Sequence, residues 1–336
     1  MNFIELTRAL VDIESITDNE GQVGAYLLDY LSKLAAGTGG RVEKMDVAPR
    51  RFNVLAIWGE PRVTLSTHMD TVPPFFASRE DPEFIWGRGA CDAKGIIAAM
   101  IGAAEKLLAE GVKNFALLFV VGEERNSAGA AVAAQAPRGS KYLVNGEPTE
   151  NKLALASKGV LRYEVVARGK MAHSAYPELG QSAIDALLDA LEAIRRVPLP
   201  KDDLLGPCTM NIGTLSGGRA PNVIADAAKA EIMVRLVGDP EEIRDAFTRA
   251  VGSRAQLDEI LSIPPVRFQS VDGMPTTVVS FATDVPVFGK SWGEPLLLGP
   301  GSIHVAHTAE ERISKREIAE AVTMYADVVK KLLARA

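Results

Sequence analysis

The segment LLFVVGEERNSAG, from Leu117 to Gly129, joins a strongly apolar run to two adjacent carboxylates, Glu123 and Glu124. Such an apolar run is typical of a strand that is buried on both faces. A buried carboxylate is costly unless it is neutralised or binds a metal, and two neighbours at one strand end also repel each other. The segment therefore predicts that a positively charged group lies at the end of this strand.

Composition limits the classes of protein to which the chain can belong. Its 336 residues favour two domains or one domain with a large insertion, and a hydrophobic content of 47% is ample for a core. The net charge of −6 disfavours nucleic acid or an anionic membrane as a partner. We expect a soluble, cytoplasmic protein, because the sequence shows no signal-peptide pattern, no membrane-spanning run and, with only Cys91 and Cys208, no disulfide framework.

Helical and strand-like periods alternate through the first half of the chain. The helical patterns cover residues 2–13, 23–34 and 93–111, and the strand-like runs cover residues 53–59, 62–68, 115–122 and 141–148. This alternation predicts an α/β fold with a doubly wound, largely parallel sheet.

The pattern changes near Leu161. Residues 161–266 contain a self-contained strand–helix–strand–strand–helix set, after which a core strand at 295–301 and a long helix at 314–333 complete the chain. We predict a catalytic domain built from residues 1–160 and 267–336, with an α+β domain of residues 161–266 inserted into it.

Carboxylates and imidazoles follow the ends of several predicted strands. They are His68, Asp70, Asp92, Glu123, Glu124, Glu147, His304 and His307. Sites in open α/β sheets form beyond the carboxyl ends of the strands, and this mixture of side chains is the ligand set expected for Zn²⁺ or a related metal. Each member has an ordinary alternative, since Asp92 could cap a helix and paired glutamates could simply be solvated. Their occurrence together favours a metal site.

Six motifs occur in order along the chain: STHMDTVP, GRGACDAKG, VVGEE, NGEPT, MAHSAYP and GPGSIHVAHTAEE. They resemble the motifs of a family of dinuclear zinc hydrolases that includes acetylornithine deacetylase, succinyl-diaminopimelate desuccinylase, aminoacylases and glutamate carboxypeptidases. The resemblance covers essentially the whole chain. It implies a zinc-exopeptidase-like catalytic domain with a mixed, mostly parallel sheet, and an inserted domain that serves as a lid and dimerises.

The resemblance also implies two divalent metal ions per chain, Zn²⁺ first, with Co²⁺ able to substitute. Asp92 would bridge the two metals. His68 and Glu147 would complete the shell of the first metal. Glu124 and His307 would complete the shell of the second.

Further roles follow from the same resemblance. Glu123 would be the general base, and Asp70 would orient the His68 ring. His304 competes with His307 for the ligand position, and the family pattern favours His307. His304 would then be a substrate-binding or outer residue of the pocket.

The inserted domain carries three further candidates. His173 would stabilise the oxyanion, Asn222 would bind the acyl or carbonyl oxygen of the substrate, and Arg235 would hold its carboxylate. A structural salt bridge is the alternative for Arg235. The resemblance implies a homodimer in which His173 acts in the partner's site.

The sequence predicts hydrolysis of an amide that links an acyl group to an amino acid. The resemblance associates Glu147, rather than an aspartate, with acyl-amino-acid hydrolases and carboxypeptidases, and the segments SFATDVPVF and GPGSIHVAHTAEE look most like acetylornithine deacetylase. The main prediction is therefore a deacylase acting on acetylornithine or on acetylated or carrier-bound lysine. Succinyl-diaminopimelate desuccinylase, carboxypeptidase or dipeptidase activity is the alternative. A non-catalytic homologue is disfavoured because the base and all five ligands are present, and a phosphatase because no basic cluster accompanies the motifs.

Overall fold

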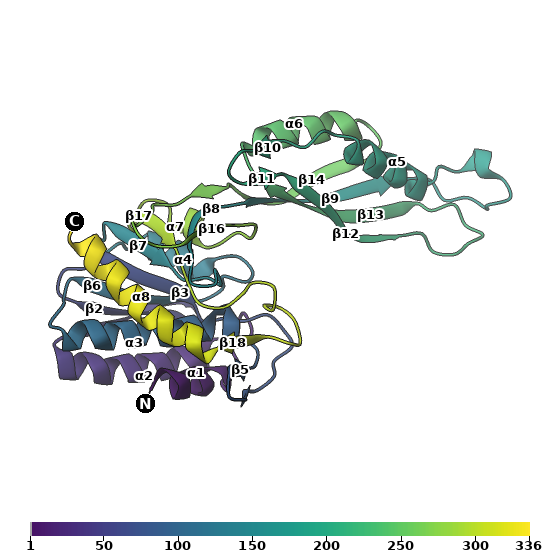
Figure 1. The fold of residues 1–336 in the computed structure, drawn as a ribbon. Coiled ribbons are helices and arrows are strands. Elements are labelled where there is room, and N and C mark those ends of the chain that lie inside the picture. The colour runs from purple at the N-terminus through teal and green to yellow at the C-terminus, as the bar shows by residue number, and fades with distance from the viewer. Residues whose placement is uncertain (1) are drawn as a thin grey trace. The chain divides into compact units, whose positions relative to one another are not determined.

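The computed structural model describes residues 2–336, which form two compact units (Figure 1). Unit 1 takes in the chain up to Leu155, Phe268–Thr277 and Thr283–Ala336. Unit 2 consists of Ala156–Arg267 and Val278–Ala282. The return of Val278–Ala282 to unit 2 was not part of the sequence-based division at residues 161 and 266.

The large sheet has nine strands within residues 2–336. Eight of them follow the order β1 (Arg41–Ala48), β2 (Arg51–Trp58), β6 (Phe115–Val120), β3 (Val63–His68), β7 (Tyr142–Asn145), β17 (Glu294–Leu297), β8 (Leu153–Ser157) and β15 (Val266–Arg267), and β16 (Thr276–Val279) pairs with β8. Strands β6, β3, β7 and β17 form a block of four parallel strands. The pairs β1–β2, β2–β6 and β17–β8 are antiparallel. The predicted α/β fold with a mixed, mostly parallel sheet is confirmed.

Helices cover both faces of this sheet in unit 1 (Figure 1). One face carries α1 (Phe3–Val11), α2 (Gly21–Thr38), α3 (Gly95–Ala109) and α8 (Lys315–Leu333), and the other carries α4 (Ala128–Ala134) and α7 (Val285–Phe288). Burial on both sides explains why β6 is apolar along its whole length, and every residue of β3 is buried as well. The predicted end of α3 is confirmed, since Gly111 adopts a positive φ of 75° just after it.

A three-stranded sheet lies beside the large one in unit 1. Its order is β18 (Arg312–Ser314), β5 (Phe84–Trp86) and β4 (Arg79–Glu80). The chain then passes from β5 through a turn at Ala90–Lys94 into α3.

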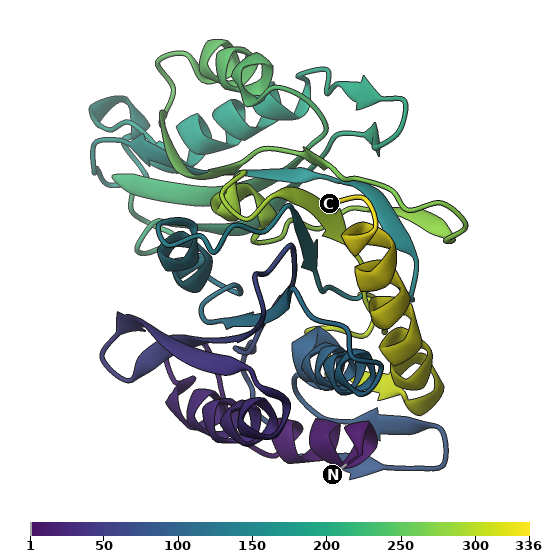
Figure 2. The same cartoon turned by 90° about the vertical axis from the view of Figure 1, so that its left-hand side faces the viewer.

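Unit 2 is an antiparallel sheet covered by two helices on one face (Figure 2). Its strands are β12 (Thr209–Gly217), β13 (Ala227–Leu236), β9 (Gly159–Arg168) and β14 (Gln256–Ile263), in that order, and its helices are α5 (Ala183–Arg195) and α6 (Pro240–Val251). Along β13, Ile232 and Val234 are buried in the core beneath the helices, and Arg235 points to the other face. A short helical turn, Pro177–Leu179, and the pair β10 (Lys201–Asp202) and β11 (Gly206–Pro207) complete the unit.

Within residues 2–336 there is no helix with the length and apolar character needed to span a bilayer.

Candidate active site

The parallel strands of unit 1 bring the predicted carboxylates and imidazoles to one edge of the sheet. His68 is the last residue of β3, Glu123 and Glu124 follow β6, and Glu147 follows β7. The segment that contains His307 follows β17. Because parallel strands end at the same edge, residues distant in sequence meet there.

Asp70 holds the loop that carries the paired glutamates. Its Oδ1 accepts hydrogen bonds from the backbone N–H groups of Gly122, at 2.9 Å, and Glu123, at 3.1 Å. Its Oδ2 accepts from the N–H of Glu124, at 3.2 Å, and from the Thr17 hydroxyl, at 2.8 Å. Burial opposes ionisation of Asp70, but the nearby His68 ring, together with the hydroxyl and amide donors, holds its pKa below the ordinary value. Sequence reasoning missed these contacts, because no local pattern links residues so far apart.

The His68 ring lies between two acceptors. Its Nδ1 is 3.0 Å from the backbone carbonyl oxygen of Asp70 and 3.6 Å from that residue's Oδ1. The sequence assigned the orienting role to the Asp70 side chain, but the carbonyl is the closer acceptor, since the carboxylate is engaged with the amides of residues 122–124. A donor bond from Nδ1 leaves Nε2 as the nitrogen available for a ligand.

The Asp92 carboxylate lies between two histidines. Its Oδ1 is 2.9 Å from Nε2 of His68, and its Oδ2 is 3.3 Å from Nε2 of His307. The same nitrogen of His307 is 2.9 Å from Oε1 of Glu124. Although burial raises it, hydrogen bonds from His307 and His68 hold the pKa of Asp92 well below its ordinary range. Asp92 is not a helix cap, since Lys94 occupies that position at the start of α3.

The donor set fits a metal centre. His68, Asp92 and Glu124 each offer one ligand atom, and these atoms lie within 4.8 Å of one another. Glu147 is buried, and within residues 2–336 its Oε1 has no hydrogen-bond partner. Burial, with nearby charged groups, raises the pKa of Glu147 well above its ordinary value and also raises that of Glu124. Divalent cations would supply the charge that these oxygens lack.

Glu123 differs from its neighbour in its contacts. Glu124 contacts His307, whereas the Glu123 side chain has no hydrogen bond among residues 2–336. Burial, followed by the charge of Glu147, raises the pKa of Glu123 well above its ordinary value. A carboxylate with a raised pKa and no fixed partner can exchange a proton with a substrate or a water molecule.

Two further features of this edge bear on its geometry. A Cβ on Gly299 would lie 2.5 Å from the carbonyl oxygen of Glu147, so the strand ends approach closely here only because this residue is glycine.

Asp284, at the start of α7, is a buried acid that sequence reasoning missed. Burial raises its pKa to about 7.

The structure separates the two competing histidines. His307 adopts a positive φ of 62° and contacts both Asp92 and Glu124 through Nε2. Both rings are exposed, but among residues 2–336 no hydrogen bond or ion pair joins His304 to Asp92 or Glu124. A metal-binding role therefore fits His307.

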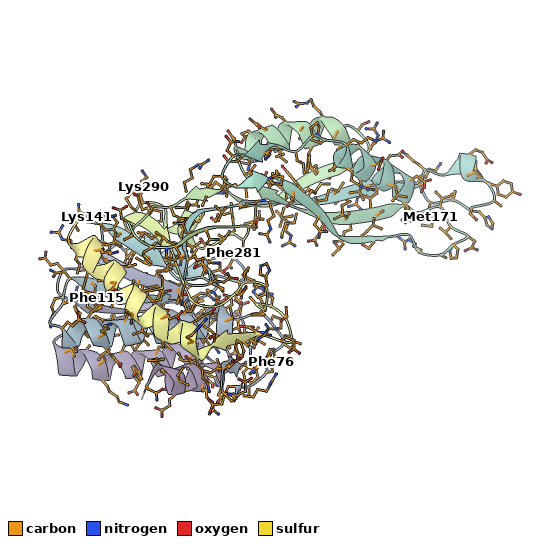
Figure 3. The ribbon with its side chains drawn as sticks, viewed as in Figure 1. Phe76, Phe115, Lys141, Met171, Phe281 and Lys290 are labelled. Carbon is orange, nitrogen blue, oxygen red and sulfur yellow. The ribbon has the colours of Figure 1, made fainter. Side chains whose placement is uncertain are left out.

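Unit 2 brings His173 and Asn222 together by itself. The N–H of Ser174 donates to the carbonyl oxygen of Asn222 at 3.0 Å, and His173 forms an antiparallel bridge with Val223. Nδ1 of His173 accepts a hydrogen bond from the N–H of Ala175 at 3.1 Å, so Nε2 carries the proton and can donate. The ring is exposed, and His173 lies two residues after Met171, which Figure 3 labels.

Arg235 lies on the face of the unit 2 sheet that the helices do not cover. It is partly buried, and no ion pair holds it among residues 2–336, which weakens the alternative of a structural salt bridge. Desolvation lowers the pKa of its guanidinium. A partly desolvated guanidinium without a partner is suited to a carboxylate.

Comparison with known proteins places the chain in a family. Residues 64–331 match the model of the family described as "Peptidase family M20/M25/M40". A Peptidase M20 domain-containing protein of Schizosaccharomyces pombe is 38% identical over 338 residues, covering 98% of this chain and 84% of the relative. A probable carboxypeptidase of Aspergillus oryzae is 36% identical over 382 residues, covering 99% and 88%.

Solved structures share the fold. The aminopeptidase PepT of Bacillus cereus superposes with a TM-score of 0.80 at 20% identity, covering 99% of this chain and 98% of that one. The M20 metallo-carboxypeptidase Sso-CP2 of Sulfolobus solfataricus gives 0.79 at 16% identity, covering 99% of both chains. Since the family model matches most of the chain and relatives 36–38% identical span nearly all of it, the chain belongs to peptidase family M20/M25/M40 and is a hydrolase of peptide-like amide bonds.

Proposed function

We propose that the protein is a dinuclear metal-dependent exopeptidase of the carboxypeptidase or dipeptidase type. The observation that carries the metal assignment is the Asp92 carboxylate, whose two oxygens face the ligand nitrogens of two different histidines, His68 and His307. Relatives named as carboxypeptidases, at 36% identity over most of both chains, support peptidase activity above the deacylase activity that the sequence suggested first. The second candidate is hydrolysis of an N-acyl amino acid such as acetylornithine or acetyl-lysine. It is retained because the unpaired Arg235 would hold the carboxylate of either kind of substrate.

The proposed metal ligands are His68, Asp92, Glu124, Glu147 and His307. Zn²⁺ is the first expectation, and Co²⁺ could replace it. When bound, two divalent cations polarise the scissile carbonyl and lower the pKa of a water molecule. We keep the cytoplasm as the proposed location.

The protein's own residues would move the protons and bind the substrate. Glu123 would take a proton from the attacking water and deliver it to the leaving amine. Asp70 would keep that base in place through the amides of residues 122–124. The Nε2–H of His173 would stabilise the developing oxyanion, with Asn222 beside it and Arg235 on the substrate carboxylate.

The first prediction separates the base from the ligand. Glu123→Gln should keep its metals, because the amide has the size of the carboxylate and the ligands are unchanged. Its kcat should fall by roughly 10²–10⁴-fold, because the proton acceptor is removed. Glu124→Gln should lose metal affinity as well, because a ligand charge is removed. Metal analysis alongside steady-state kinetics tests both variants. Depletion of metal in the Glu123 variant, with full occupancy in the Glu124 variant, would reverse the two roles.

The second prediction concerns protons released when metal binds. Hydrogen bonds to Asp92 and Glu124 raise the pKa of His307 to about 10 in the metal-free protein, so this ring is protonated at pH 8. Binding of Zn²⁺ at pH 8 should therefore release about one proton from His307. Calorimetry in buffers of different ionisation enthalpy measures this release, and His307→Gln should release about one proton fewer. Equal proton release from both proteins would contradict the assignment.

The same shift sets the sign of a stability effect in the metal-free protein. Because the folded pKa of His307 is raised, its contribution is fully present below the unfolded pKa, about 6.5. That contribution is lost as pH rises through about 10. In denaturant unfolding of the metal-free protein, the midpoint should fall as pH rises from about 6.5 through about 10. This fall should be smaller in the His307→Gln variant.

The third prediction tests the reaction. With Zn²⁺ or Co²⁺ present, the protein should release amino acids from a panel of dipeptides and peptides with a free C-terminus faster than from acetyl- or succinyl-amino acids. Chelation should abolish the activity, and either metal should restore it. Faster hydrolysis of acetyl-amino acids would favour the second candidate, and full activity in a preparation without metal would reject both.

The fourth prediction concerns assembly. We propose a two-fold homodimer formed through unit 2, in which His173 serves the site that contains Glu123 of the other chain. Glu123→Ala and His173→Ala should each be nearly inactive alone. After dissociation and random re-pairing, about half of the dimers are mixed and each contains one intact site, so about a quarter of the activity should return. If a labelled-chain control proves exchange and no activity returns, His173 does not act across the dimer.

A further inference from the structure

Glu311 and Arg88 form a buried ion pair that none of the roles above uses. Oε2 of Glu311 accepts from Nη1 of Arg88 at 2.5 Å, and the two side chains are 1% and 2% exposed. A buried ion pair is weak evidence for stability, because the desolvation of both charges offsets their attraction. The other contacts of this pair show what it holds.

The second oxygen of Glu311 binds the turn that contains Asp92. Its Oε1 accepts hydrogen bonds from the backbone N–H groups of Cys91 and Asp92, each at 3.2 Å. The backbone of Asp92 has φ −127° and ψ 88°, so its amide is not part of a helical hydrogen-bond ladder. Glu311 supplies the acceptor that these two buried amides would otherwise lack.

Glu311 also ties this turn to the segment that carries His307. It lies four residues after His307, and its carbonyl oxygen accepts from the N–H of Gly87 at 3.1 Å. The pairing of β18 with β5 continues the same connection, with Arg312 opposite Trp86.

Arg88 is itself fixed in place. Its Nε donates to the carbonyl oxygen of Pro74 at 3.2 Å, and its guanidinium lies 5.0 Å from the ring centroid of Phe76, which Figure 3 labels. The guanidinium therefore offers Glu311 a countercharge whose position is set by these two contacts.

We propose that Glu311 is a positioning residue, which fixes the Asp92 backbone so that the carboxylate of Asp92 lies between His68 and His307, while Arg88 neutralises the charge of Glu311. The inference rests on the proposed bridging role of Asp92. It assigns no ligand role to Glu311, whose oxygens are taken by Arg88 and by the two amides.

Two variants separate the acceptor from the ion pair. Glu311→Leu removes both. The double variant Glu311→Gln with Arg88→Met keeps an oxygen for the amides of Cys91 and Asp92 and removes the charges. If the oxygen that accepts from these amides positions Asp92, Glu311→Leu should lose Zn²⁺ affinity about 10–100-fold. The double variant should bind Zn²⁺ with an affinity close to wild type. Zn²⁺ titration of metal-depleted protein measures both.

A second measurement does not depend on metal. In the metal-free protein, hydrogen exchange of the Cys91 and Asp92 amides should accelerate in Glu311→Leu and stay slow in the double variant. Glu43→Gln is the matched control, since it breaks the ion pair with Arg138 in unit 1 and touches no proposed ligand. It should change neither readout.

The outcomes are distinct. Wild-type Zn²⁺ affinity in folded Glu311→Leu would overturn the positioning role. If that variant does not fold, the double variant decides, because a loss of affinity there despite the retained oxygen would also overturn it. If the wild-type protein binds no metal, the proposed function fails, and the exchange rates of the two amides still show whether Glu311 holds the turn.

Discussion

Repulsion among carboxylates at one edge of the sheet is the constraint on which the site depends. Like charges at short range in a poorly solvated environment cannot all be ionised without donors or cations. The protein supplies donors to Asp70 and Asp92, and their pKa values fall. It leaves Glu123 and Glu147 with fewer donors, and their pKa values rise. The edge thus contains two kinds of acid. Some receive hydrogen bonds from the protein, and the others need a bound cation or a proton.

The strand-end residues were predictable because the signal is local. A strand buried on both faces is a continuous apolar run, as in Leu117–Val121, and a carboxylate directly after it has to be accounted for. The same logic finds His68 at the end of β3 and Glu147 after β7. The choice between His304 and His307 could not be made from strand ends, because it depends on the backbone of a loop. His307 adopts a positive φ there, and its ring contacts Glu124.

The contacts that support these residues were not predictable from local patterns. Asp70 binds amides more than fifty residues away, and Glu311 binds amides more than two hundred residues away. These pairings depend on how the loops pack after the sheet forms. Strand β14, Gln256–Ile263, was missed for a related reason, because neither of its faces is buried enough to produce a clear alternation.

Unit 2 holds the loop of His173 by its own hydrogen bonds, which bears on the proposed homodimer. Hydrogen bonds between Lys170 and Gln181, and between Ser174 and Asn222, close the loop of His173 within unit 2. The bond from the Ala175 amide fixes the tautomer of the ring in the same unit. The loop contacts and the tautomer of this ring are therefore determined within unit 2 itself.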